Sequence, residues 1–176
     1  MNRKSRAQWN NQVIVSNRVS KFPICILAVH DLAQEVLKYL KFKKVLLSLA
    51  FVTDNLICRL NQRFLEHSYA TDVLAFPFLA NSQNTKRAKR GSSGQLTVGF
   101  YFLGEVIVSP NQAKIRSKEF QASFACELMR YMCHGILHLA GHQDRTQVQK
   151  KQMRQLEDFL MRRFAQSCKE IVSDGD

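Results

Sequence analysis

Two histidines spaced four residues apart are the side chains of this sequence best suited to chemistry. They are His134 and His138, in the stretch His-Gly-Ile-Leu-His. On an α-helix such a pair lies on one face, about 6 Å apart along the axis. Both imidazoles can then bind one metal ion at about 2.1 Å. The alternative is a pair of core or cleft histidines that hydrogen-bond to the backbone, which is common on helices.

The third ligand is either Asp144 or His142. His142 continues the four-residue spacing, but on an unbroken helix it would lie about 12 Å along the axis from His134, which suits one tetrahedral ion poorly. Gly141 is typical of a helix C-terminus, because glycine adopts the left-handed cap conformation. The chain can then fold back and bring Asp144 to the ion. We therefore favour Asp144 over His142.

The two residues adjacent to His134 argue against a cysteine ligand and against a zinc protease of the HExxH type. Cys133 points about 100° away from its neighbour on a helix, so we do not expect it to bind the same metal. Gly135 occupies the position of the glutamate base in zinc proteases of the HExxH type. Peptide hydrolysis by that mechanism is therefore disfavoured, and a metallopeptidase is the weakest of the functions considered.

At these residues the sequence resembles the YbeY family of bacterial rRNA maturation factors, which are metal-dependent single-strand endoribonucleases. The family pattern is H-G-x-L-H-L-x-G-x-x-H, and only its last position departs here, because the third histidine ligand of the family falls on Asp144. An aspartate can also bind zinc, so the resemblance implies a site with altered charge and metal preference. The matching stretch is His134-Gly135-Ile136-Leu137-His138-Leu139-Ala140-Gly141-His142-Gln143-Asp144.

Two further elements of the family occur in the same order. One is Leu60-Asn61 followed by Thr71-Asp72-Val73-Leu74-Ala75-Phe76-Pro77-Phe78, and the other is Leu103-Gly104-Glu105-Val106-Ile107-Val108. A second departure concerns a functionally important arginine of the family, which aligns with Leu65. Arg63 lies two residues earlier and could replace it only with a different local backbone.

The resemblance implies a small mixed sheet flanked by helices, with a zincin-like metal helix and a metal site in a cleft beneath the sheet edge. It implies an endoribonuclease that acts on single-stranded ribosomal RNA, in small-subunit rRNA processing and ribosome quality control. Zinc is the expected cofactor, and another divalent transition metal is the alternative. The expected partners are RNA and ribosomal subunit proteins.

The elements that must position these residues alternate along the chain. Hydrophobic periodicity predicts strands at 12–17, 44–54 and 73–78. A strand pattern at 96–108 contains Gly99 and Gly104, which mark a bend or bulge, and we expect a hairpin or two paired segments there. It predicts helices at 30–40 and 56–64, one long helical region from the Ser109–Gln112 capping box to about Leu139, and a last helix at 146–167. The apolar run 44–54 suits a strand buried on both faces. We therefore expect a single α/β or α+β domain over residues 1–176.

The charge of the chain indicates a polyanionic partner. Its 176 residues have a formal net charge of +12, which folding does not need. The polar segment 79–95 reads as an exposed, mobile loop. It carries Lys86, Arg87, Lys89 and Arg90, which either hold the RNA backbone or form a solvated loop.

The cellular setting follows from the cysteines and from the apolar segments. No apolar run reaches the roughly 20 residues of a membrane-spanning helix, and the N-terminus lacks the apolar region of a secretory signal. The five cysteines include no CxxC pair, so free thiols in a reducing compartment are expected. These features predict a cytoplasmic protein without a membrane partner.

The sequence does not single out a general base. His142, His67 and Glu127 are the candidates, with Arg63 as a further catalytic candidate, although Glu127 is better suited to an ion pair with Arg130 or Arg162. The alternative to a nuclease is a ribosome- or RNA-binding factor with a structural or vestigial metal site, which the departures at Asp144 and Leu65 favour.

Overall fold

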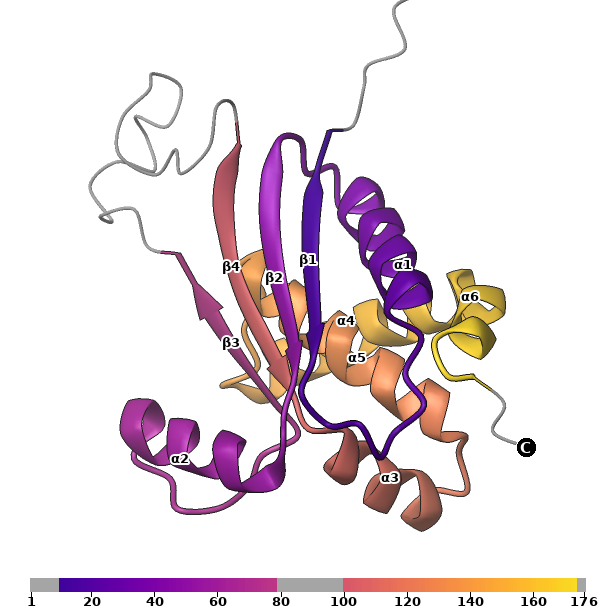
Figure 1. The fold of residues 1–176 in the computed structure, drawn as a ribbon. Helices are drawn as coiled ribbons and strands as arrows, with labels where there is room; N and C mark the ends of the chain where they lie inside the picture. The colour runs from indigo at the N-terminus through magenta and orange to yellow at the C-terminus, as the bar shows by residue number, and fades with distance from the viewer. Residues whose placement is uncertain (1–9, 79–99, 174–176) are drawn as a thin grey trace, which may run out of the picture.

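Strands and helices alternate up to residue 77, the next described element is a further strand that ends at residue 108, and the described elements after it are all helices (Figure 1). The structure is a computed structural model that describes residues 10–78 and 100–173. The described elements, in chain order, are β1 Gln12–Asn17, α1 Ile26–Tyr39, β2 Val45–Phe51, α2 Asp54–Leu65, β3 Val73–Pro77, β4 Tyr101–Val108, α3 Pro110–Glu119, α4 Phe124–Leu139, α5 Gln147–Arg163 and α6 Ala165–Glu170.

The strands form one four-stranded sheet in the order β1-β2-β4-β3. Strands β1, β2 and β4 are parallel, whereas β3 is antiparallel to β4 and lies at an edge of the sheet. This arrangement confirms the expected α/β class with a small mixed sheet flanked by helices. None of the helices in the described ranges is both long and apolar enough to cross a membrane.

The two faces of the sheet are covered unequally. Leu47 and Leu49 of β2 point into the main core, which they share with residues of α1, α4, α5 and α6. Ala50 belongs to a smaller cluster on the other face, which residues of α2 cover. On that second face Leu46 and Ser48 are only half-buried. The prediction that the strand is buried on both faces therefore holds only for its C-terminal end.

Three predicted helices are confirmed with adjusted ends. The helices predicted at 30–40 and 56–64 are α1 and α2, and α1 begins four residues earlier than its apolar spacing indicated. The helix predicted at 146–167 is α5, which has Thr146 as its N-cap and ends at Arg163, where α6 follows. The described residues after β4 thus hold four helices, α3 to α6, where two were expected.

The prediction of one helical region from residue 109 to 139 is wrong. The helix is interrupted at residues 120–123, where Gln121 has a positive φ of 52°. The side chain of Ser123 then accepts a hydrogen bond from the backbone N–H of Cys126 and begins α4. The break contains neither glycine nor proline, so its strongest sequence signal was the N-cap serine.

The predicted capping box at α3 is also wrong. Ser109 does accept the backbone N–H of Gln112, as an N-cap should. However, the amide of Gln112 donates to Asp54, and the backbone N–H of Ser109 donates to the carbonyl of Asp72. Asp54 also accepts hydrogen bonds from Ser109 Oγ and from Asn111. The start of α2 is thereby joined to the start of α3.

The strand pattern predicted at 96–108 is a single strand over its described part, β4, and no hairpin is found within it. The bulge expected at Gly104 is confirmed, because Leu46 pairs with Phe102 whereas Leu47 pairs with Gly104. Gly99 and the basic segment 79–95, with Lys86, Arg87, Lys89 and Arg90, lie outside the described residues.

Candidate metal centre

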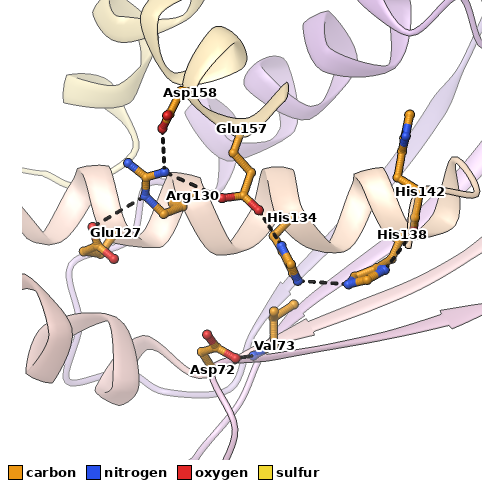
Figure 2. Close-up of polar contacts among 9 residues, drawn as sticks. All are labelled: Asp72, Val73, Glu127, Arg130, His134, His138, His142, Glu157 and Asp158. Atoms are coloured by element: carbon orange, nitrogen blue, oxygen red, sulfur yellow. Dashed lines mark hydrogen bonds and ion pairs between the residues drawn. The ribbon is translucent and has the colours of Figure 1, made fainter. Parts of the chain in front are cut away.

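Helix α4 presents His134 and His138 on one face, one turn apart, as their spacing predicts (Figure 2). The helix packs against β3 and β4, so this face lies beneath the edge of the sheet. Both histidines are half-buried, and their rings meet edge to face with centroids 4.4 Å apart. The two imidazoles therefore converge instead of pointing separately to solvent.

The end of α4 has the cap geometry that Gly141 predicts. Gly141 has a φ of 94°, and its N–H donates to the carbonyl of His138. The N–H of His142 donates to the carbonyl of Leu137, which completes a Schellman motif. The helix stops at this point and the chain turns back, so Asp144 returns toward the histidines.

The Nδ1 atom of each imidazole lies within hydrogen-bond distance of an acceptor oxygen. Nδ1 of His134 lies 2.6 Å from Oε1 of Glu157 on α5. Nδ1 of His138 lies 3.0 Å from the backbone carbonyl of His142. A carbonyl can only accept and a carboxylate normally does so, which places a proton on both Nδ1 atoms. Partners of this kind fix the tautomer and ring orientation of histidines that bind metals.

The Nε2 atoms, which are the other ring nitrogens of the two histidines, consequently face each other. Nε2 of His134 and Nε2 of His138 are 2.9 Å apart (Figure 2). With protons on both Nδ1 atoms, two neutral imidazoles would direct lone pairs at one another, which is repulsive. A cation between them, either a proton or a metal ion, turns this repulsion into attraction.

The two pKa values are shifted in opposite directions. Burial lowers the pKa of His134, but the hydrogen bond and the charge of Glu157 outweigh burial and raise it above its ordinary value. Burial lowers the pKa of His138, and the charge of His134 lowers it further. A positive charge on His134 therefore disfavours protonation of His138 at its second nitrogen.

Asp144 completes a set of three donors. One nitrogen from each histidine and one carboxylate oxygen of Asp144 lie within 4.8 Å of one another. No other group of three His, Cys, Asp or Glu side chains this close is found in the described residues. Two ligands of one zinc ion lie at most about 4.2 Å apart when each bond is about 2.1 Å. A small rotation of the Asp144 side chain thus suffices, and the donor set fits a zinc-like ion.

A cavity of about 270 Å³ opens beside two of these donors, His134 and Asp144. Its walls come from α4, from α5, from Asp144 between these helices, and from Asp72, the residue before the edge strand β3. Burial and the charge of Asp72 raise the pKa of Tyr131 in the wall, so this phenol stays protonated. The cavity is lined by Asp72, Arg130, Tyr131, His134, Asp144, Lys150, Met153, Arg154 and Glu157.

Glu157 is a residue of this site that the sequence analysis missed. It is 8% exposed and lies among the apolar residues that α5 packs into the core. Arg130 holds it in place, with Nη1 3.6 Å from Glu157 Oε2 and 3.1 Å from Asp158 Oδ1 (Figure 2). The available signal was a carboxylate beside the apolar stripe of the last helix, since buried charges are normally paired.

Asp72 was also missed, although it stands in the second family element. One of its carboxylate oxygens accepts from the backbone N–H of Val73 and from the hydroxyl of Thr71. These bonds fix the carboxylate at the start of β3, in the cavity wall. Its position depends on the pairing of β3 with the sheet, which local sequence patterns do not reveal.

The other candidate residues on and near α4 do not line the cavity. The side chain of His142 points away from His138 (Figure 2) and lines a separate hollow with Tyr39 and Phe159. Only its backbone carbonyl reaches the metal centre. Glu127 is 7% exposed and lies 3.7 Å from Nε of Arg130. The predicted ion pair of Glu127 with Arg130 is confirmed.

The candidates on and after α2 are exposed and also lie outside the cavity wall. The guanidinium of Arg63 lies over the ring of Phe64, and the ring of His67 stacks on Tyr69. Leu65, at the position of the family arginine, is 52% exposed. None of these three side chains is brought to the histidines.

Gly135 and Cys133, the two neighbours of His134, are buried in the packing of α4 against the rest of the protein. A Cβ atom on Gly135 would lie 2.5 Å from Cγ1 of Val106, so glycine lets α4 approach β4 closely. Cys133 is 1% exposed, and burial raises its pKa to about 12. A protonated thiol in the core is a poor metal ligand. Position 135 faces the sheet, so a glutamate base could not be accommodated there.

Comparison with known proteins matches the same region. The profile of the family described as Endoribonuclease YbeY covers residues 14–165. The Endoribonuclease YbeY of Myxococcus xanthus is 36% identical over 129 residues, which are 73% of this chain and 40% of the relative. The Salinibacter ruber protein of that name is 38% identical over 112 residues, 64% of this chain and 66% of the relative. The chain thus spans less than two thirds of the length of either relative.

A solved structure supports the fold. The solution structure of a Thermotoga maritima protein is 21% identical, with a TM-score of 0.52, and the match covers 94% of this chain and 99% of the other. At this identity the likeness concerns the fold alone. The profile match, in contrast, extends from β1 to the start of α6 and includes the histidine motif. The resemblance drawn from the three sequence elements is therefore confirmed, and the chain belongs to the YbeY family.

Proposed function

We propose that this chain is a metal-dependent endoribonuclease that cleaves single-stranded RNA during maturation of small-subunit ribosomal RNA in the cytoplasm. The observation that carries the proposal is the 2.9 Å approach of the two Nε2 atoms of His134 and His138, whose Nδ1 atoms are both held by acceptors. The name Endoribonuclease YbeY of the relatives supports the reaction and the RNA substrate.

The ligands in this proposal are His134, His138 and Asp144. Two imidazoles and one carboxylate form a donor set typical of catalytic zinc, and another divalent transition metal is the alternative. When bound, such an ion lowers the pKa of a water molecule and neutralises charge on a phosphate. Glu157 and the carbonyl of His142 keep the two imidazoles oriented with their Nε2 atoms toward the ion.

Asp72 is the residue that we propose as proton acceptor. It lines the same cavity as His134, and hydrogen bonds to Thr71 and Val73 fix one of its two carboxylate oxygens. The other oxygen can accept a proton from a water molecule that attacks the phosphate. The bases considered from sequence, His142, His67 and Glu127, do not line this cavity.

The partner in this proposal is ribosomal RNA, with ribosomal subunit proteins as further contacts. A net charge of +12 supports a polyanionic substrate, because neutralised phosphates release counterions. The segment with Lys86, Arg87, Lys89 and Arg90 remains a proposed RNA contact. Binding by this charge would weaken steeply as the salt concentration rises.

The test is cleavage of single-stranded and duplex RNA by zinc-loaded protein, beside His138→Ala and Asp72→Asn variants purified identically. We expect the wild type to cut single strands, His138→Ala to be inactive, and Asp72→Asn to lose activity by about 10²-fold or more while it keeps its metal. The His138→Ala variant controls for contaminating nucleases. If wild type and His138→Ala cut equally, or neither cuts, the nuclease is ruled out. The RNA-binding factor with a structural metal would then be the better account.

A further inference from the structure

Two cations of α5 share the cavity of the metal centre. Lys150 and Arg154 line it together with His134 and Asp144. They are four residues apart, so their side chains project from one face of α5, about 6 Å apart along its axis. Both are exposed. An anion at the metal centre would therefore have two cations beside it, on one rigid helix.

A second hollow on α5 continues from these cations. It has a volume of about 340 Å³ and meets the metal cavity at Lys150 and Arg154, which line both. Helix α5 packs against α4, which carries the histidines (Figure 1). The two hollows are therefore neighbours, with Lys150 and Arg154 between them. The second hollow is lined by Gln147, Lys150, Lys151, Arg154, Gln155 and Asp158.

The two cations differ from Arg130, the third cation of the cavity, in their charge balance. Arg130 is neutralised by Asp158, Glu157 and Glu127, which all lie within 4 Å of its guanidinium. Neither Lys150 nor Arg154 has an ion pair or a side-chain hydrogen bond with the residues that the structure describes. Their positive charge is therefore available to a ligand, whereas that of Arg130 serves the fold.

We propose that Lys150 and Arg154 form a phosphate clamp, which holds the RNA backbone next to the phosphate that is cleaved. The proposal rests on the proposed nuclease function and names which residues bind its substrate. Arg154 can bind a phosphate through two parallel hydrogen bonds, and Lys150 binds one as a point charge. In this arrangement the RNA strand runs from the α5 hollow over Lys150 and Arg154 to the metal cavity, so the clamp determines which phosphate reaches the metal centre.

The test compares two double variants that remove the same charge. One is Lys150→Gln with Arg154→Gln, and the control is Lys118→Gln with Lys169→Gln, which removes exposed cations of α3 and α6 outside the cavity. Binding of a fluorescent single-stranded RNA oligonucleotide to zinc-loaded protein is measured by anisotropy at several salt concentrations. Zinc content and the thermal unfolding midpoint are measured for each variant.

We expect the α5 variant to bind the oligonucleotide at least about 10-fold more weakly at low salt, because it loses two charge-assisted contacts. Its salt dependence, the slope of log K against log salt, should decrease by about 1.4, since each contact with a single strand contributes about 0.7. The control variant should retain most of the affinity and the full slope. An exchange of the two cations, Lys150→Arg with Arg154→Lys, should restore most of the slope.

The outcomes separate the clamp from the nuclease function. If the α5 variant keeps its zinc and its fold and still binds with the wild-type slope, the clamp is wrong while the nuclease proposal stands. Equal losses in the α5 variant and the control would also overturn the clamp, because the effect would then reflect net charge alone. If wild-type protein does not bind the oligonucleotide at all, the clamp and the proposed function both fail.

Discussion

The carboxylate of Glu157 on α5 lies 2.6 Å from Nδ1 of His134 on α4, across the interface of the two helices. This contact ties the orientation of a proposed metal ligand to the packing of the last long helix. Arg130 supports it from α4 through Glu157 and Asp158. The candidate metal centre is therefore built by tertiary structure as well as by the spacing of the histidines.

Loss of this carboxylate should weaken metal binding. We expect Glu157→Gln to lower zinc affinity by about 10- to 100-fold, the usual effect of removing a partner of a metal-bound histidine. Competition with a chelator of known affinity measures it. Asp158→Asn is the matched control, because Asp158 is adjacent, contacts Arg130 and does not touch His134. Equal affinity of Glu157→Gln and wild type would mean that Glu157 does not orient the ligand.

The raised pKa of His134 predicts a pH-dependent contribution to stability in the metal-free protein. Below the unfolded value of 6.5 the imidazole is protonated in both states, and its ion pair with Glu157 stabilises the fold fully. As the pH rises through the raised folded-state value, this stabilisation is lost. Glu157→Gln should therefore reduce the free energy of unfolding more at about pH 5.5 than at about pH 8.5, by on the order of 1 kcal/mol.

Urea denaturation at the two pH values checks this difference. Asp158→Asn should cost the same at both pH values, because Asp158 pairs with Arg130 and forms no hydrogen bond or ion pair with His134 among the described residues. A larger effect of Glu157→Gln at the higher pH would contradict the direction of the His134 shift.

The choice between Asp144 and His142 can be tested by substitution. Asp144→Ala should lose tightly bound zinc, whereas Asp144→His should retain it, because the family pattern has histidine there. His142→Ala should also retain zinc, since only the backbone carbonyl of His142 reaches His138. The amount of zinc per chain, measured by mass spectrometry after dialysis, distinguishes Asp144 from His142 as the third ligand. Loss of zinc in His142→Ala with retention in Asp144→Ala would reverse the assignment.

Gly135 should be intolerant of any side chain. Gly135→Ala places a Cβ atom 2.5 Å from Val106 Cγ1 and 3.1 Å from Val73 Cγ2. We expect a loss of about 1–3 kcal/mol in unfolding free energy, despite the higher helix propensity of alanine. Combined with Val106→Ala, which makes room, the substitution should cost less than it does alone. A Gly135→Ala protein as stable as wild type would show that α4 can move away from the sheet.

Local features of the metal centre could be predicted from the sequence. The spacing of His134 and His138 fixes their common helix face, and Gly141 marks the end of α4, because both depend on neighbours within a turn of helix. Gln112, in contrast, bonds to Asp54, which is 58 residues away. The prediction of a capping box failed for this reason, since a distant partner, Asp54, competed for the Gln112 side chain.

Distant contacts could not be predicted in the same way. Glu157 and Asp72 join the cavity only because α5 and β3 pack beside α4. The break between α3 and α4 has no glycine or proline, and the left-handed backbone of Gln121 is held by two backbone hydrogen bonds, from its own N–H to the carbonyl of Lys118 and from the N–H of Ala122 to the carbonyl of Ser117. The resemblance to a family provided the overall arrangement, which periodicity alone did not.

The assignment of His134, His138 and Asp144 as ligands of one metal ion is tested by metal quantification. Purified protein is reconstituted with zinc, dialysed, and measured beside a His134→Ala, His138→Ala double variant of the same chain. We expect one tightly bound zinc per wild-type chain and none in the variant. A wild-type chain without tightly bound zinc or another transition metal, or a double variant that binds as much as wild type, would contradict it.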